Sequence, residues 1–161
     1  MYDDNLARQS LAIAAAIGVA SSGEKAEARR MDAGGAPVFW RQVARLGISQ
    51  FQEPQWLHFA RLVAILTPSS AQTSIHQNGQ QLGAALAGAG LSEPRFARLL
   101  AARGPARLNA LERAVRMLAR AHPTLDVVSL ASFVFDRDGN ALARSYYQRL
   151  DHSEIERTEH A

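Results

Sequence analysis

The sequence predicts an all-α protein, a compact bundle of about eight or nine helices. Apolar residues recur at intervals of three and four along almost every segment, which places them on one face of a helix. Strict alternation of apolar and polar residues, the pattern of a half-buried strand, nowhere persists for the length of a strand. Proline, glycine and capping residues separate the periodic segments, at the positions where helices start and stop. A packed helical bundle is therefore the predicted architecture.

The chain has the size and composition of one folded unit. Its 161 residues are 47% hydrophobic and 20% charged, which is typical of a globular protein rather than a disordered one. We expect a single all-helical domain over residues 1–161, either one body or two small lobes, with residues 1–3 and 156–161 frayed. The sequence has no repeat of fixed period, which argues against a solenoid.

Two helices are predicted at the beginning of the chain. The first covers Asp4–Ala20. Its apolar stretch Leu11–Ala20 is too short to span a membrane, and two aspartates precede it in place of the basic residues that start a signal peptide. Ser21-Ser22-Gly23 then interrupts the helix before a short charged helix over Glu24–Met31.

Proline begins the next two helices, because its missing N–H costs nothing in the first helical turn. Pro37 precedes a helix over Val38–Leu46, and Gly47 ends that helix. Pro54 begins the following helix, which ends at Thr67-Pro68. An apolar stripe at i, i+3, i+7 and i+10 of this helix is predicted to lie in the core; it consists of Trp56, Phe59, Val63 and Leu66.

Three helices are predicted in the middle of the chain, after an exposed polar loop over Ala71–Gly79. A small-residue helix covers Gln80–Ala89 and ends at Gly90. A serine N-cap and a proline then begin a helix over Arg95–Arg103. A second proline begins Pro105–Ala121, which ends before another proline.

Two helices complete the chain. Asp126 is placed to cap Val127–Phe135, a nearly uncharged segment that is predicted to be buried on most sides. Asp136–Asn140 forms the turn into a last helix over Ala141–Ile155. The acidic residues beyond this helix are expected to fray.

The sequence carries no motif of an enzyme or a metal site. It contains no cysteine, which excludes disulfides and thiolate ligands and indicates a reducing compartment, the cytoplasm. Its five histidines show no HExxH spacing, and His58 is interpreted as structural. P-loop, G-x-G-x-x-G and G-x-S-x-G motifs are lacking, and Gly83 and Gly88 are attributed to close helix packing. We expect a non-enzymatic protein with no cofactor, metal, small-molecule substrate or membrane association.

Positive charge is concentrated in the middle of the chain. Residues 29–122 contain twelve arginines and four acidic residues, a net charge of +8, whereas the whole chain carries +3. The planar guanidinium suits phosphate oxygens, so this excess favours a nucleic-acid partner. Genomic codon bias toward arginine and alanine would produce the same composition and remains an alternative.

The predicted helix Pro105–Ala121 separates its charged residues from its apolar ones. Its apolar stripe consists of Leu108, Leu111, Val115 and Leu118. At 100° per residue, three arginines on the opposite side lie within about 60° of one another. Two more arginines, spaced i, i+3, lie on the preceding helix. The five candidates for nucleic-acid contact are Arg95, Arg98, Arg113, Arg116 and Arg120.

Several short patterns also follow one another in a recognisable order. They are Glu27-Ala28-Arg29-Arg30-Met31, Pro37-Val38-Phe39-Trp40-Arg41, Arg61-Leu62-Val63, Leu82-Gly83-Ala84-Ala85-Leu86, Ser92-Glu93-Pro94-Arg95, Leu99-Leu100, Arg116-Met117-Leu118, Pro123-Thr124-Leu125-Asp126 and Ala143-Arg144-Ser145-Tyr146-Tyr147. Taken together, over residues 29–147, they resemble the CasB family, the small subunit of the type I-E CRISPR Cascade complex.

The resemblance implies an all-helical protein without a catalytic centre. It implies two copies in a complex with other Cascade subunits and guide RNA. It further implies contacts between basic surface and target DNA, including the displaced single strand, during R-loop formation. The basic positions that best match the family's binding surface are Arg30, Arg95, Arg116 and Arg137, followed by Arg41 and Arg61. The chain departs from the family pattern where a basic residue is expected, at Gln55, Ala84, Pro94 and Asp136.

Three functions are weighed on these observations. The preferred one is a Cascade subunit that contacts phosphates without reading sequence and stabilises the R-loop in antiviral defence. The first alternative is a helical adaptor whose arginines bind acidic proteins. The second is a helix-turn-helix regulator, which requires polar base-reading residues on an exposed helix face. Trp40 and Trp56 are assigned to core packing rather than base stacking, because each belongs to an apolar stripe.

Overall fold

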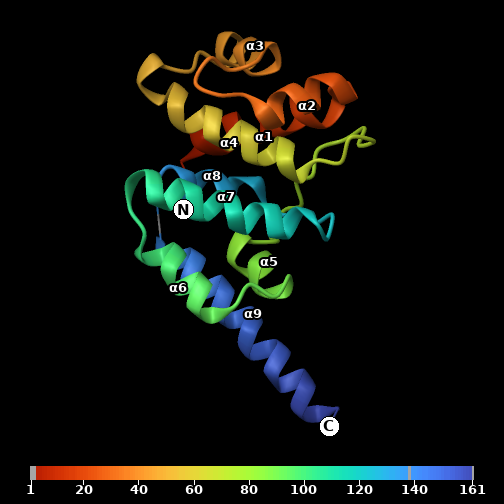
Figure 1. Ribbon diagram of the computed structural model, residues 1–161, viewed down its shortest axis with the longest axis vertical. Coiled ribbons are helices and arrows are strands. Elements are labelled where there is room, and N and C mark those ends of the chain that lie inside the picture. Colours follow the sequence, from red (N-terminus) through yellow and green to blue (C-terminus); the bar gives the residue numbers. More distant parts are fainter. Residues whose placement is uncertain (1–2, 138, 161) are drawn as a thin grey trace.

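The computed structural model describes residues 3–137 and 139–160. These residues form nine α-helices and one 3-10 helix: α1 (Asp4–Val19), α2 (Ser22–Arg30), α3 (Pro37–Leu46), η1 (Gln50–Gln52), α4 (Glu53–Leu66), α5 (Leu82–Gly88), α6 (Glu93–Ala101), α7 (Gly104–Ala119), α8 (Val127–Val134) and α9 (Gly139–Glu159). Helices α1 to α4 lie at one end of the molecule, α5, α6 and α9 at the other, and α7 and α8 between them (Figure 1). The predicted all-α class is confirmed.

Local capping residues set the helix starts. Ser21 and Glu24 form a capping box on α2, in which the Ser21 hydroxyl accepts from the Glu24 N–H at 3.1 Å and the Glu24 carboxylate accepts from the Ser21 N–H at 3.3 Å. Ser92 and Asp126 cap α6 and α8 with their side chains, as predicted. Gly47 ends α3 with a positive φ of 63°, a conformation that costs glycine little.

Helix α4 is the centre of the core. It packs against α1, α2, α7 and α8. Its predicted apolar stripe is confirmed, since Trp56, Phe59, Val63 and Leu66 are all almost completely buried. The Trp56 ring lies edge-on to Phe59, with a centroid distance of 5.4 Å, and 4.8 Å from the ring of Phe135. One continuous hydrophobic cluster contains buried residues from α1 through α9.

Helix α5 packs closely against α9 through a glycine. A Cβ added at Gly83 would come within 2.2 Å of the Ser145 hydroxyl and 2.3 Å of the Leu142 carbonyl oxygen. The predicted role of Gly83 in close packing is therefore confirmed. The same interpretation is wrong for Gly88, where a Cβ would lie 3.6 Å from the Arg149 side chain, an ordinary contact.

The segment between α4 and α5 was expected to be an exposed polar loop, but contacts with the rest of the protein hold it in place. Ile75 is buried, and its neighbours pair with the segment before α8: the Gln77 N–H donates to the Leu125 carbonyl at 2.8 Å, and the Leu125 N–H donates to the Ile75 carbonyl at 3.2 Å. This isolated bridge is the sole β-pairing within the described residues. On the other side, the backbone of Thr73 lies so close to α1 that a Cβ at Gly18 would approach it within 2.4 Å.

Two basic side chains of α2 attach the same segment to the body of the protein. Lys25 is 1% exposed, and its Nζ donates to the carbonyls of Ala20 at 2.7 Å and Ala71 at 2.6 Å. One turn later, Arg29 donates to the carbonyls of Ala64 at 2.9 Å and Thr67 at 2.6 Å. Because the last carbonyls of a helix have no partner within it, Arg29 completes the hydrogen bonding at the end of α4.

Some helices and helix boundaries differ from the expectations. Helix η1 was not predicted. Helix α9 begins at Gly139, inside the expected turn, and continues to Glu159, four residues past the predicted end at Ile155; it projects from the body of the molecule (Figure 1). Residues 1, 2 and 161 of the expected frayed ends, and residue 138 of the expected turn, lie outside the described residues.

The predicted core position of Trp40 is wrong. Its side chain is 39% exposed on α3. The indole N–H donates to the Gly34 carbonyl at 2.8 Å, and the ring tilts against Phe39 at a centroid distance of 5.1 Å. The apolar face of α3 buries Val38 and Phe39 instead, so Trp40 lies at the margin of that face rather than on it.

Candidate nucleic-acid interface

A groove between α6 and α7 brings together three of the arginines that the sequence singled out. Arg95 and Arg98 of α6 and Arg113 of α7 line this α6/α7 groove, whose volume is about 360 Å³. The remaining lining residues are apolar: Leu91, Leu99, Ala110, Ala114 and Met117. The groove therefore combines cationic side chains with an apolar floor.

Helical periodicity turns these arginines outward. Helix α6 buries Phe96 and Leu99, and α7 buries its stripe of leucine, alanine and valine, so the arginines occupy the opposite, exposed faces. Phe96 stacks on Tyr146 of α9 with a centroid distance of 3.8 Å, and the Tyr146 hydroxyl donates to the Leu91 carbonyl at 2.6 Å. Burial raises the pKa of Tyr146 above its ordinary value, which keeps this donor protonated. These contacts fix α6 against α9.

Four arginines on this surface have no internal partner. Within residues 3–137 and 139–160, Arg95, Arg98, Arg113 and Arg120 form no ion pair and no side-chain hydrogen bond. All four are exposed. Their charges are consequently available to an anionic partner.

Arg116 and Arg61 share a carboxylate. Arg61 of α4 forms an ion pair with Glu112 of α7 and donates from Nε to the Arg29 carbonyl at 3.1 Å. Arg116 lies 3.7 Å from the other oxygen of Glu112 and stays half exposed. Arg61 thus links α2, α4 and α7, a structural role that the sequence did not indicate, whereas Arg116 still faces solvent beside the unpaired arginines.

The other three candidates lie apart from the groove. Arg41 of α3 pairs with Glu24 at 2.5 Å. The Ser21 N–H first, and then Arg41, lower the pKa of Glu24 below its ordinary value. Arg137 pairs with Asp3 at 3.3 Å. Arg30 is exposed at the end of α2 and forms no ion pair with the described residues.

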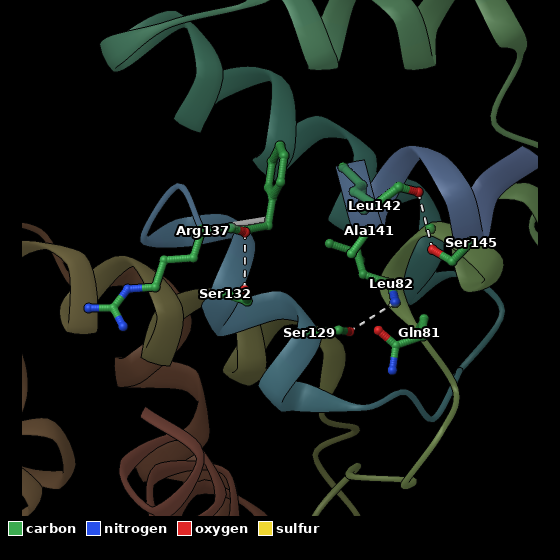
Figure 2. Close-up of a pocket in the computed structure, with 10 residues that line it drawn as sticks. Gln81, Leu82, Ser129, Ser132, Arg137, Ala141, Leu142 and Ser145 are labelled. Carbon is green, nitrogen blue, oxygen red and sulfur yellow. Dashed lines mark hydrogen bonds between the residues drawn. The ribbon is translucent and has the colours of Figure 1, made fainter. Parts of the chain in front are cut away.

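Figure 2 shows that the guanidinium of Arg137 points away from the small pocket beside it. The Arg137 carbonyl accepts from the Ser132 hydroxyl at 3.1 Å, and the Ser129 hydroxyl accepts from the Leu82 N–H at 2.9 Å. The volume of this pocket is about 10 Å³, which is room for a single water. The pocket is thus a packing feature between α5, α8 and α9.

Sequence reasoning missed the cations that hold the protein together. Besides Lys25 and Arg29, Arg107 lies 3.9 Å from the centroid of the Phe133 ring and pairs with Asp136 at 3.0 Å. The net charge of +8 in the middle of the chain therefore overstates the number of cations that are available to a partner. No pattern in α2 separates Lys25 from the exposed arginines, because its neighbours on the same helix face are Ser22, Ala28 and Arg29 and its burial depends on contacts with the segment after α4.

The described residues contain no group of three or more histidine, aspartate or glutamate side chains that could hold a metal ion. None of the described helices is long and apolar enough to cross a membrane.

The fold and the arginine-lined groove define an all-α protein with a cationic surface. The family model described as CRISPR-associated protein Cse2 matches residues 24–149, well over half of the chain. The chain therefore belongs to the Cse2 family, the CasB small subunit of type I-E Cascade in CRISPR defence, as the resemblance indicated.

One solved structure supports this fold. The crystal structure of CasB from Thermobifida fusca matches with a TM-score of 0.60 and 23% sequence identity, and the match covers 78% of this chain and 84% of that chain. No curated protein matches the sequence.

Proposed function

We propose that this Cascade subunit binds nucleic acid without catalysis, through the α6/α7 groove and the adjoining face of α7, and thereby stabilises the R-loop. The observation that carries the proposal is the set of unpaired arginines on these two helices and at the C-cap of α7: Arg95, Arg98, Arg113 and Arg120. Four unneutralised charges on neighbouring helices attract a polyanion, and guanidinium groups bind phosphate oxygens through paired N–H donors.

The proposed contact is with the backbone and not with base edges. In an RNA-guided complex, pairing between guide and target reads the sequence, so an accessory subunit has only to hold the unwound strands. The proposed partners are target DNA, including the displaced single strand, and the other Cascade subunits with their guide RNA. A second copy of the chain is a further proposed partner, and the cytoplasm is the proposed location.

The remaining candidate arginines have a smaller part in the proposed contact with nucleic acid. Arg30 is exposed without an ion pair, but it lies at the end of α2, apart from the groove. Arg116 keeps half of its side chain in solvent. Arg41, Arg61 and Arg137 each contact a carboxylate of the protein itself. A bound phosphate would have to compete with these carboxylates.

The test compares two variants that remove the same charge. The groove variant carries Arg95→Ala, Arg98→Ala, Arg113→Ala and Arg120→Ala. The control variant replaces four exposed arginines elsewhere, namely Arg8, Arg45, Arg144 and Arg157. R-loop formation by guide-loaded complexes containing each variant is measured at several salt concentrations.

The groove variant should weaken R-loop formation and flatten the plot of log K against log salt by roughly 0.7–0.9 per lost phosphate contact. The control variant should stay close to the wild type. Far-UV circular dichroism verifies that both variants remain helical. If both variants lose the same activity, total charge and not the groove is responsible; if neither loses activity, this surface does not bind nucleic acid.

A further inference from the structure

A second pocket lies at the opposite end of the molecule, where the end of α2 meets α3, η1 and α4. This Trp40 pocket has a volume of about 460 Å³, within the range of roughly 300–1,000 Å³ that is usual for ligand sites. Its lining is mostly apolar and includes Met31, Ala33, Trp40, Pro54 and Leu57. The unpaired arginines of the α6/α7 groove belong to other helices.

An aromatic ring is held in a fixed orientation at the wall of the pocket. Trp40 is 39% exposed, and its N–H bond to the Gly34 carbonyl fixes the orientation of the ring. The backbone of Gly35 lies against the indole, so that a Cβ there would be 2.6 Å from Nε1. Phe51 of η1, beside the lining residue Gln50, is 87% exposed. Exposed aromatic side chains are enriched at protein interaction surfaces.

The charge of the pocket is negative, although its residues belong to the segment 29–122, which carries a net charge of +8. Asp32 and Glu53 line it, and neither forms an ion pair with the residues that the structure describes. The one cation in the lining, Arg61, is paired with Glu112, whereas the two carboxylates have no ion-pair partner among the described residues, and Arg30 is not among the lining residues. Burial, assisted by Arg61, lowers the pKa of His58, so its ring is neutral at pH 7.

We infer that the Trp40 pocket binds an arginine or lysine side chain presented by a partner protein. The cation would lie against the exposed part of the indole, because aromatic faces attract positive charge. Asp32 and Glu53 would supply the compensating negative charge. These two carboxylates repel phosphates, so the pocket and the α6/α7 groove suit different partners. The inference does not depend on nucleic-acid binding.

The experiment follows the two tryptophan indole N–H signals of the ¹⁵N-labelled full chain by NMR. Trp56, which is 1% exposed, serves as an internal control. The probe is an N-acetylated Gly-Arg-Gly amide, and the matched control peptide contains citrulline, which has the same shape without the charge. The Trp40 signal should shift and saturate with the arginine peptide while the Trp56 signal stays in place. Binding should be about tenfold weaker with citrulline, and equally weakened by the double substitution Asp32→Asn, Glu53→Gln.

The inference is overturned if the Trp40 signal does not move, or if it moves equally with both peptides. If the Trp40 signal shifts when the protein concentration is raised without any peptide, the pocket binds a second copy of the chain. A shift with a single-stranded oligonucleotide would assign it to nucleic acid, and both results also overturn the inference.

A second measurement tests whether a partner in the assembly uses the pocket. The double variant should be incorporated into Cascade less completely than the wild type, whereas the groove variant should be incorporated normally. Normal incorporation of the double variant would show that no subunit depends on the pocket, and would overturn the inferred partner.

Discussion

Trp56 lies between two other aromatic rings in the core and is 1% exposed. Trp56→Ala should lower the free energy of unfolding by about 3–5 kcal/mol, because it removes a large buried side chain and leaves a cavity. Urea unfolding followed by circular dichroism measures the loss. Trp40→Ala is the control, since its side chain is 39% exposed and should cost much less. Equal losses would show that the two rings do not differ in burial.

His58 should make stability depend on pH. Burial lowers its pKa in the folded protein below the ordinary value of about 6.5. Below about pH 6.5 the unfolded chain then binds this proton more readily than the folded protein, so stability falls as the pH decreases toward the folded pKa. His58→Gln should reduce the decrease in urea midpoint between pH 7.5 and pH 5. Parallel curves for wild type and variant would contradict this expectation.

The sequence predicted which arginines are exposed. It did not predict which of them form ion pairs. Spacing on one helix placed Arg113, Arg116 and Arg120 on a common face, and all three are exposed. Their partners depend on tertiary contacts: Glu112 of α7 reaches Arg61 of α4, a residue from a distant part of the chain. Helical periodicity describes one helix at a time, so it cannot identify a carboxylate that another helix supplies.

At the scale of elements, the contact between α5 and α9 depends on a missing side chain. Gly83→Ala should separate the two helices and lower the free energy of unfolding by about 1–3 kcal/mol, because the added methyl group meets Ser145 and the Leu142 backbone. Gly23→Ala is the matched control in α2, where the nearest atom would be 3.9 Å away. That substitution should stabilise the protein by about 0.5–1 kcal/mol, since alanine favours helix. Stabilisation by both substitutions would disprove the close contact.

Helix starts were predictable where a side chain or a proline marks them. Ser92 and Asp126 accept the hydrogen bonds expected of N-caps, and Pro37 lies in the first turn of α3. The end of α9 carries no such mark: the residues after Ile155 include no proline or glycine, and the helix continues to Glu159. Helix η1 was missed because three residues are too few for any periodicity to be visible.

At the scale of the whole molecule, the family resemblance and the structure select different sets of four arginines for nucleic-acid binding. The family resemblance selects Arg30, Arg95, Arg116 and Arg137, and the structure selects the residues of the groove variant. Two members of the first set contact Glu112 and Asp3. The groove variant should therefore weaken binding of the isolated protein to single-stranded DNA more than the alanine variant of the first set does.

Fluorescence anisotropy with two oligonucleotides of unrelated sequence measures this difference. Both oligonucleotides should give the same order of affinities, because phosphate contacts carry no sequence information. A larger loss in the first set would mean that Arg30 and Arg137 bind phosphate in spite of their distance from the groove. A strong preference for one sequence would favour a regulator over a Cascade subunit.

Lys25 is the single lysine of the sequence, and its amine is enclosed between two carbonyl groups. Acylating reagents require an accessible, unprotonated amine, so they should leave this side chain unmodified while the native contacts persist. Mass spectrometry after treatment with acetic anhydride should find Lys25 unmodified in buffer and acetylated in urea. Modification in buffer at the rate of a free lysine would contradict its burial. The protein thus contains its own chemical reporter, one reactive side-chain amine whose labelling rate measures how often α2 separates from the segment after α4.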